Sequence, residues 1–275
     1  MDLLVFDLDG TLLNRKSTIS PYTRNTLRLL AERGIAYTVA TGRTLHASRD
    51  VLTGQGFLLP QIYKNGVVIW QPDTEDYSHT AFLTQAEIQQ VLEAVLAQRV
   101  TPFIFTLEPG NRHAIYHPPL QNDVEERLAR EFGKRSEVPV LPVDQLPADA
   151  DITNVSALGK PAAIDAIAMA VIDQANLVAY SGSAIEGQGL KWIDIHHGDA
   201  SKGGAVSRLK DELGVSRVVC FGDGENDLSM FELADECYAP ENAESEVKAA
   251  ATAVIGHHDE DGIARFLRER FNLPG

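Results

Sequence analysis

The sequence contains only two cysteines, Cys220 and Cys237, among its 275 residues. Two cysteines cannot form the disulfide framework of a small secreted domain, and Cys220 follows two valines as a small hydrophobic residue of a strand would. No apolar run approaches the length of a membrane-spanning helix. The sequence begins Met1-Asp2 without the basic region of a signal peptide. We therefore expect a cytoplasmic protein that has no association with membranes.

Positive charge is also scarce, since 24 Lys+Arg face 39 Asp+Glu and the net charge is -15. A chain this acidic repels phosphate backbones, so nucleic acid and anionic membranes are poor partners. A small anionic substrate remains possible, because a bound metal and a few local cations can outweigh the distant field. The length and the 44% hydrophobic content allow one large domain or two modest ones with real cores.

The N-terminal stretch combines a short apolar run with two closely spaced acids. Residues 3–6 are all hydrophobic, as in a strand buried on both faces, and Asp7, Asp9 and the Gly10-Thr11 reversal follow. Open α/β sheets bind ligands at the carboxyl ends of their strands. Two carboxylates there repel each other unless a cation lies between them. The spacing suggests a divalent metal, although a strand that merely ends in an acidic turn has the same pattern.

A βαβ unit is predicted over the first forty residues. Ser20 before Pro21 is a good helix start, and a helix to Arg33 would be followed by a strand over residues 35–40. The short connections imply that the two strands are parallel. Their carboxyl ends then share one edge, which places Thr41 and Gly42 near Asp7.

The middle of the chain has a different pattern. A capping box at Thr84 and Glu87 opens an amphipathic helix, and predicted strands occur in pairs around the helices that follow. This arrangement favours an α+β insert with an antiparallel sheet over residues 80–187. Residues 1–79 and 188–275 would form the core, with residues 192–195 as its first strand after the insert.

A second acidic group follows a later strand of the core. The strand predicted over residues 217–221 ends in Asp223, and Asp227 lies four residues further on. Between the two acidic groups, Ser201-Lys202 opens a helix whose free N–H groups, dipole and ammonium favour an anion. Carboxylates, a cation, a hydroxyl and amide donors at neighbouring strand ends are the parts of a phosphoryl-transfer site.

These residues carry a family resemblance. The sequence resembles the haloacid dehalogenase (HAD) superfamily, specifically the Cof-type phosphatases with a C2B cap inserted between two parts of the core. The four motifs occur in order: Asp7-Leu8-Asp9-Gly10-Thr11, Thr41-Gly42-Arg43, Ser201-Lys202-Gly203 and Gly222-Asp223-Gly224-Glu225-Asn226-Asp227. Subfamily elements match Asn65-Gly66, Asn242-Ala243, Lys248 and Asp261-Gly262. The resemblance implies an α/β fold: a Rossmann-like parallel sheet core flanked by helices, with an inserted α+β cap domain.

The resemblance also assigns chemistry. It implies that Asp7 is the nucleophile that forms an aspartyl-phosphate, and that Asp9 is the general acid and base. Mg2+ would be held by Asp7, by the backbone carbonyl of Asp9 and by Asp223, with Asp227 further out or acting through a water. These four aspartates are the expected metal site.

Other residues would hold the substrate. The resemblance implies that Thr41, Gly42 and Lys202 bind the phosphoryl oxygens, with Asn226 at the phosphate edge and Asn65 near the mouth. Arg43 directly follows the Thr-Gly pair and is a candidate for the same site. Purely structural roles also stay open for these residues: a Thr-Gly turn is common, Asn65 can be a turn residue, and Asn226 and Asp227 can be helix caps.

The predicted function is a Mg2+-dependent phosphatase for small phosphorylated metabolites, with sugar phosphates favoured, in a monomer or weak homodimer. A phosphomutase of the phosphomannomutase type and a non-catalytic sugar-phosphate-binding module are the alternatives. Specificity is expected to come from the cap, with the hairpin at residues 108–111 and the loop at residues 181–187 as candidates.

Overall fold

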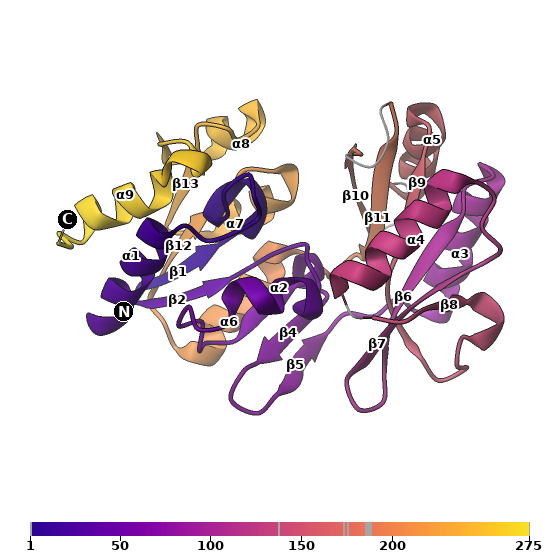
Figure 1. Cartoon of the computed structure of the whole chain (residues 1–275), viewed down its shortest axis with the longest axis horizontal. Coiled ribbons are helices and arrows are strands. Elements are labelled where there is room, and N and C mark those ends of the chain that lie inside the picture. The colour runs from indigo at the N-terminus through magenta and orange to yellow at the C-terminus, as the bar shows by residue number, and fades with distance from the viewer. Residues whose placement is uncertain (1, 137, 173, 175, 185–188, 275) are drawn as a thin grey trace. The chain divides into compact units, whose positions relative to one another are not determined.

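The computed structural model describes residues 2–136, 138–172, 174, 176–184 and 189–274. The chain divides into two compact units. Residues 1–80 and 201–275 form the core unit, and residues 81–200 form the inserted unit. In the colour scale of Figure 1, which follows residue number, the inserted segment runs from magenta to salmon, and the core segments are indigo to purple and orange to yellow. Among the described residues, no helix combines the length and the apolar composition that crossing a bilayer requires.

The core is built on a five-stranded parallel sheet with the order β14-β13-β12-β1-β2. Its strands in chain order are β1 (Asp2–Phe6), β2 (Ala36–Val39), β12 (Arg217–Phe221), β13 (Glu236–Pro240) and β14 (Ala253–Ile255). The apolar residues 3–6 are fully buried, because β1 has a neighbouring strand on each side and covered faces above and below. The parallel arrangement confirms the predicted βαβ unit.

Helices pack on both faces of this sheet, and alternate strand residues point to opposite faces. Leu3 and Val5 of β1 share an apolar cluster with Val206 and Leu209 of α6 (Lys202–Leu213). On the other face, Phe221 packs against Phe266 of α9 (Gly262–Arg270) with ring centroids 6.0 Å apart. The core helices are α1 (Pro21–Glu32), α2 (Leu45–Leu52), α6 (Lys202–Leu213), α7 (Leu228–Leu233), α8 (Ser245–Ala250) and α9 (Gly262–Arg270).

A small antiparallel sheet continues from β2. It has the order β3-β4-β5, with β3 (Gln61–Tyr63), β4 (Val68–Gln71) and β5 (Asp76–Thr80). A bridge between Ala40 and Ile62 joins it to the end of β2. Residues 64–66 form the turn between β3 and β4, and the polar stretch after β4 leads into β5.

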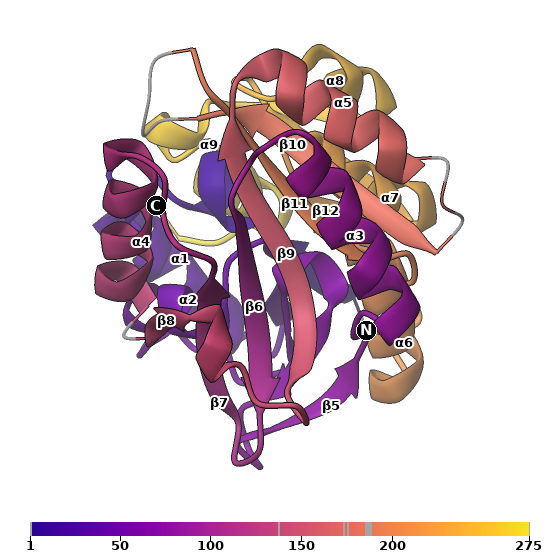
Figure 2. The same ribbon diagram turned by 90° about the vertical axis from the view of Figure 1, so that its right-hand side faces the viewer.

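The inserted unit contains a six-stranded mixed sheet with the order β10-β11-β9-β6-β7-β8. Figure 2 shows β6 and β9 side by side, with α3 beside them. All neighbours except β7 and β8 are antiparallel. The elements are α3 (Gln85–Ala97), β6 (Pro102–Glu108), β7 (Arg112–His117), α4 (Asp123–Ser136), β8 (Val140–Pro142), β9 (Asp151–Gly159), α5 (Pro161–Ile172), β10 (Leu177–Ser183) and β11 (Lys191–His197). The α+β cap is therefore confirmed as a fold class.

One strand lies in a different sheet from the one expected. The sequence predicts that residues 192–195 return to the core, whereas β11 pairs with β10 and β9 of the inserted sheet. The insert therefore ends near Ala200 and not at residue 187. A short apolar strand pattern shows that a strand forms but not which neighbour it pairs with. Residues 185–187 of the candidate specificity loop lie outside the described residues.

Candidate active site

Three parallel strands bring their following residues to one edge of the core sheet. The amide of Asp7 donates to the carbonyl of Phe221 on β12 over 2.9 Å. The amide of Ala40 donates to the carbonyl of Phe6 over 2.9 Å. Asp7, Thr41 and the turn that follows Phe221 are therefore neighbours across the sheet, as the βαβ prediction required.

A hydrogen bond connects the loop that follows β1 with the loop that follows β12. The hydroxyl of Thr11 donates to Oδ1 of Asp223 over 2.6 Å, although 212 positions separate them in sequence. Gly10 adopts φ +74°, and a Cβ at this position would lie 2.2 Å from Oδ2 of Asp223. Only glycine allows this approach without a shift. The side chain of Asn242 also holds the loop after β1, since its Nδ2 donates to the carbonyl of Gly10 over 2.7 Å.

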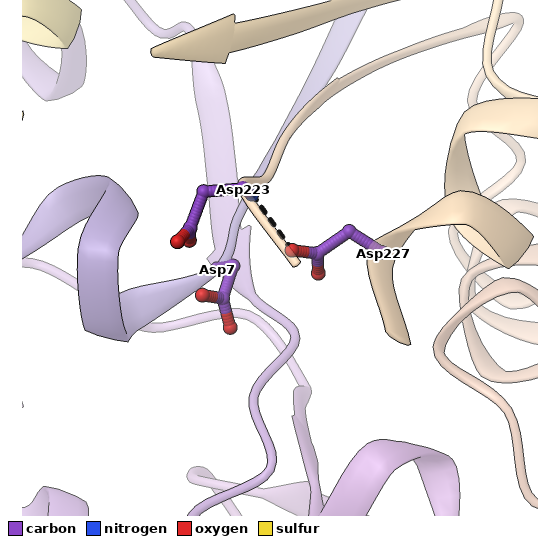
Figure 3. A group of neighbouring side chains, drawn as sticks. All are labelled: Asp7, Asp223 and Asp227. Atoms are coloured by element: carbon purple, nitrogen blue, oxygen red, sulfur yellow. Dashed lines mark hydrogen bonds between the residues drawn. The ribbon is translucent and has the colours of Figure 1, made fainter. Parts of the chain in front are cut away.

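Asp7, Asp223 and Asp227 converge at this edge. One carboxylate oxygen from each lies within 4.8 Å of the others, and Figure 3 shows the three side chains gathered around the strand ends. The ammonium of Lys202 lies 2.6 Å from Oδ1 of Asp7 and 2.6 Å from Oδ1 of Asp227. Lys202 is fully buried, so its charge is matched by these carboxylates and not by solvent.

The cluster carries more negative than positive charge. Burial raises the pKa of Asp7 well above its usual range, and the charges of Asp227 and Asp223 add to the effect against the opposing pull of Lys202. Burial likewise raises the pKa of Asp223 to about 6. The pKa of Lys202 is raised, because Asp227 and Asp7 outweigh the burial that would lower it. One ammonium cannot neutralise three buried carboxylates, which leaves a deficit of positive charge.

Asp227 is engaged by the protein on both oxygens. Its Oδ2 accepts from the amides of Asp223 and Gly224 over 2.8 and 3.0 Å, and its Oδ1 accepts from Lys202. The helix-cap alternative is thus close to what the structure shows, because the side chain closes the turn after β12 and binds backbone N–H groups. Its direct contribution to a metal would be small.

Asp7 and Asp223 fit a divalent cation better. Within the described chain, no hydrogen bond from the protein reaches Oδ2 of either carboxylate. Three carboxylates and one ammonium sum to a charge of -2, which a divalent ion would cancel. Carboxylate oxygens are the ligands that Mg2+ prefers. The residues present therefore fit the expected metal.

Asn65 and Asn226 are in contact, although Asn65 lies between β3 and β4 and Asn226 follows β12. Nδ2 of Asn226 donates to Oδ1 of Asn65 over 2.9 Å, and Asn65 is only 4% exposed. The backbone of Asn65 is left-handed at φ +55°, and its amide donates to the carbonyl of Thr41 over 3.0 Å. A Cβ on Gly42 would lie 3.1 Å from Oδ1 of Asn65. The structure thus brings together four of the residues expected at the phosphate.

This arrangement depends on a tight approach at Gly66. Its φ is +97°, and a Cβ there would lie 2.2 Å from the carbonyl oxygen of Ser201. Ser201 caps α6 by accepting from the amide of Gly204 over 3.0 Å. The turn that carries Asn65 therefore packs directly on the start of the helix that carries Lys202.

Asp9 does not join the carboxylate group. Its side chain is 55% exposed and is paired with Arg43, whose Nε donates to Oδ2 of Asp9 over 2.6 Å. The expected ligation of a metal through the backbone carbonyl of Asp9 stays a prediction. Sequence reasoning left the partner of Arg43 open, and it also missed the contacts of Thr11 and Asn242. All three residues lie in recognised motifs, which was the available signal.

Comparisons with known proteins identify the family of this chain. The model of the haloacid dehalogenase-like hydrolase family matches residues 4–267. A 5-amino-6-(5-phospho-D-ribitylamino)uracil phosphatase of Bacillus subtilis is 27% identical over 284 residues, covering 97% of each chain. A pyridoxal phosphate phosphatase of Escherichia coli is 28% identical over 281 residues, covering 96% of this chain and 97% of that one.

A solved structure also resembles the chain throughout. It is described as an HAD subclass IIB sugar phosphatase, and it superposes with a TM-score of 0.76 at 20% identity over 100% of both chains. This similarity confirms the predicted fold. The family match and the phosphatase relatives confirm the predicted enzyme class, an HAD-type phosphatase. The family model spans nearly the whole sequence, and so the chain belongs to the haloacid dehalogenase-like hydrolases.

Proposed function

We propose that this protein is a Mg2+-dependent phosphatase that hydrolyses small phosphorylated metabolites, with sugar phosphates favoured, through an aspartyl-phosphate on Asp7. The observation that carries the proposal is the setting of Asp7. It is buried at the end of β1, its Oδ1 is held by Lys202, and Asp223 lies beside it. A carboxylate held in this way at a strand end can ligate a cation through one oxygen and attack phosphorus with the other.

The reaction would run in two steps. An oxygen of Asp7 attacks phosphorus, the bond to the leaving oxygen breaks, and Asp9 transfers a proton to that oxygen. A water then attacks the phosphorus of the aspartyl-phosphate and gives its proton to Asp9, and the bond to Asp7 breaks to release inorganic phosphate. Mg2+ held by Asp7 and Asp223 would reduce the repulsion between carboxylate and phosphate.

The phosphoryl oxygens would be bound by the surrounding donors. Lys202 has three N–H donors, and two of them are used by Asp7 and Asp227, so the third remains for substrate. Thr41, Gly42, Asn65 and Asn226 supply the other donors in our proposal. The contact between Asn226 and Asn65 supports a shared role for that pair.

The proposed substrate class draws on the relatives. The two curated relatives are phosphatases of a phosphoribitylamino-uracil and of pyridoxal phosphate, both small phosphate monoesters. We propose that residues 81–200 act as the specificity-setting cap. Of the candidate hairpin in this unit, Glu108 is only 4% exposed and accepts from the hydroxyl of Tyr116 over 2.7 Å and from Arg112. Glu108 is therefore engaged in hydrogen bonds within this unit. The residues at the tip of the hairpin are the better candidates for setting substrate specificity.

The compartment and the oligomeric state stay predictions. The buried thiols of Cys220 and Cys237 fit a reducing, cytoplasmic compartment. A monomeric or weakly dimeric state is the prediction for the assembly. Membership of a hydrolase family favours the phosphatase over a phosphomutase or a non-catalytic binding module.

The test is phosphate release from a panel of phosphorylated metabolites, with Mg2+ and with EDTA. We expect metal-dependent release by the wild type and none by Asp7→Asn, which removes the nucleophile and one metal ligand. Asp211→Asn, at an exposed position on α6, is the matched control and should behave as wild type. Release that survives in Asp7→Asn, or that ignores EDTA, would contradict the proposal. Bisphosphate-dependent isomerisation without release would instead support the phosphomutase.

A further inference from the structure

Arg43 holds both oxygens of the Asp9 carboxylate. Its Nε donates to Oδ2 over 2.6 Å, and its Nη2 donates to Oδ1. Two parallel N–H···O bonds between a guanidinium and a carboxylate fix the plane of the carboxylate as well as its position. A single point charge would leave the carboxylate free to rotate.

Arg43 is the anchored member of this pair. Its side chain is 20% exposed, against 55% for that of Asp9. Its Nη1 donates to the carbonyl of Ala47 over 3.3 Å, and its own amide donates to Oγ1 of Thr41 over 3.2 Å. Its carbonyl accepts from the amide of Lys64 over 3.0 Å. The side chain is therefore held by α2, and the backbone of Arg43 is held by Thr41 and by the turn that carries Asn65.

Asp9 has no comparable support. Its side chain lies on the exposed side of the loop after β1, and Arg43 is its only hydrogen-bond partner within the described part of the chain. An exposed carboxylate without a partner would sample several rotamers, and ordering it has an entropic cost. Because its other contacts hold Arg43 in place, Arg43 sets the orientation of the Asp9 carboxylate.

We propose that Arg43 is a positioning residue that aims the Asp9 carboxylate for proton transfer. This inference rests on the proposed function, in which Asp9 is the general acid and base. Each carboxylate oxygen has two acceptor sites, and the guanidinium occupies one on each. The outer sites remain for a proton exchanged with the leaving oxygen or with water. Arg43 acts through Asp9 and does not touch the reacting atoms.

The alternative is that Arg43 binds the phosphoryl group directly, and the two roles differ in their dependence on the leaving group. An alkyl phosphate needs a proton on its leaving oxygen, whereas 4-nitrophenolate leaves without one. We compare kcat/KM, which reports the steps up to formation of the aspartyl-phosphate, for a good alkyl substrate and for 4-nitrophenyl phosphate. Loss of phosphate binding would affect both substrates equally.

The variants are Arg43→Ala, Arg43→Lys, Asp9→Asn and the double variant Arg43→Ala/Asp9→Asn. We expect Arg43→Ala to lower kcat/KM for the alkyl phosphate by about 10- to 100-fold, which is part of the roughly 100- to 10,000-fold contribution of general acid catalysis itself, and to change the aryl value less than about threefold. Arg43→Lys should restore only part of the loss, since it retains the charge without the fork. In the Asp9→Asn background, Arg43→Ala should add almost nothing.

Arg24→Ala removes an exposed arginine of α1 and serves as the control. Thermal unfolding of each variant checks that the fold is retained. Equal losses on both substrates, additive losses in the double variant, or full rescue by Arg43→Lys would overturn the positioning role. Absence of any phosphatase activity in the wild type would instead refute the proposed function, so the two failures are distinguishable.

Discussion

Replacing Lys202 with methionine would leave Asp7 and Asp227 buried without their shared cation. The ammonium is fully buried and lies 2.6 Å from an oxygen of each carboxylate. Removing one partner of a buried ion pair typically costs about 3–5 kcal/mol, because the remaining charge is neither solvated nor matched. We therefore expect Lys202→Met to lower the free energy of unfolding by about 4 kcal/mol, a large part of the stability of an ordinary domain.

The loss should depend on pH in a defined direction. Burial and the nearby carboxylates already raise the pKa of Asp7 in the folded state, and removal of Lys202 would raise it further. A carboxyl whose pKa is higher in the folded state binds its proton more tightly when folded. The free energy of unfolding then falls as pH rises from the unfolded pKa, about 4, towards the folded value. The deficit of Lys202→Met should therefore be smaller at about pH 5 than at about pH 8.

The assay is urea unfolding with EDTA at the two pH values, followed by circular dichroism. The control is Lys210→Met on the same helix. The Lys210 side chain is 31% exposed, and its ammonium lies 3.5 Å from Oδ2 of Asp235. An exposed pair of this kind contributes less than about 1 kcal/mol. A Lys202→Met deficit no larger than that of Lys210→Met, or one that grows as pH falls, would refute the reasoning. Adding Mg2+ should recover part of the loss, because the cation replaces the missing charge.

Three further predictions concern the loops around the cluster. Asp223→Asn should raise the Mg2+ concentration needed for half-maximal rate. In the wild type, the affinity for Mg2+ should rise as pH increases through about 6, because Asp223 loses its proton there. Thr11→Val removes the hydrogen bond that lowers the pKa of Asp223, so the same titration of Mg2+ binding should shift to higher pH. Gly66→Ala should destabilise the fold by about 2 kcal/mol or more, from positive φ and contact with Ser201. Gly54→Ala, at φ +74° with open space around it, should show only the conformational part, about 1 kcal/mol, in the same urea measurement.

Local rules predicted many elements of the fold correctly. Ser20 caps α1 by accepting from the amide of Thr23, and Thr84 forms the capping box with Glu87. These features depend on residues three positions apart, which a sequence displays directly. The assignment of β11 failed for the opposite reason, since its neighbours in the sheet are set by the packing of a whole unit.

The sequence by itself determined which residue types stand at the ends of the parallel strands, and parallel strands place their ends at one edge for any sequence with short βαβ connections. Only the tertiary structure decided how those side chains pair. Lys202 is shared between Asp7 and Asp227, 195 and 25 positions away, and Asp9 turns to Arg43, 34 positions away, and not to the cluster. Such pairings depend on sheet register, loop conformation and rotamers at once, and no local pattern encodes them.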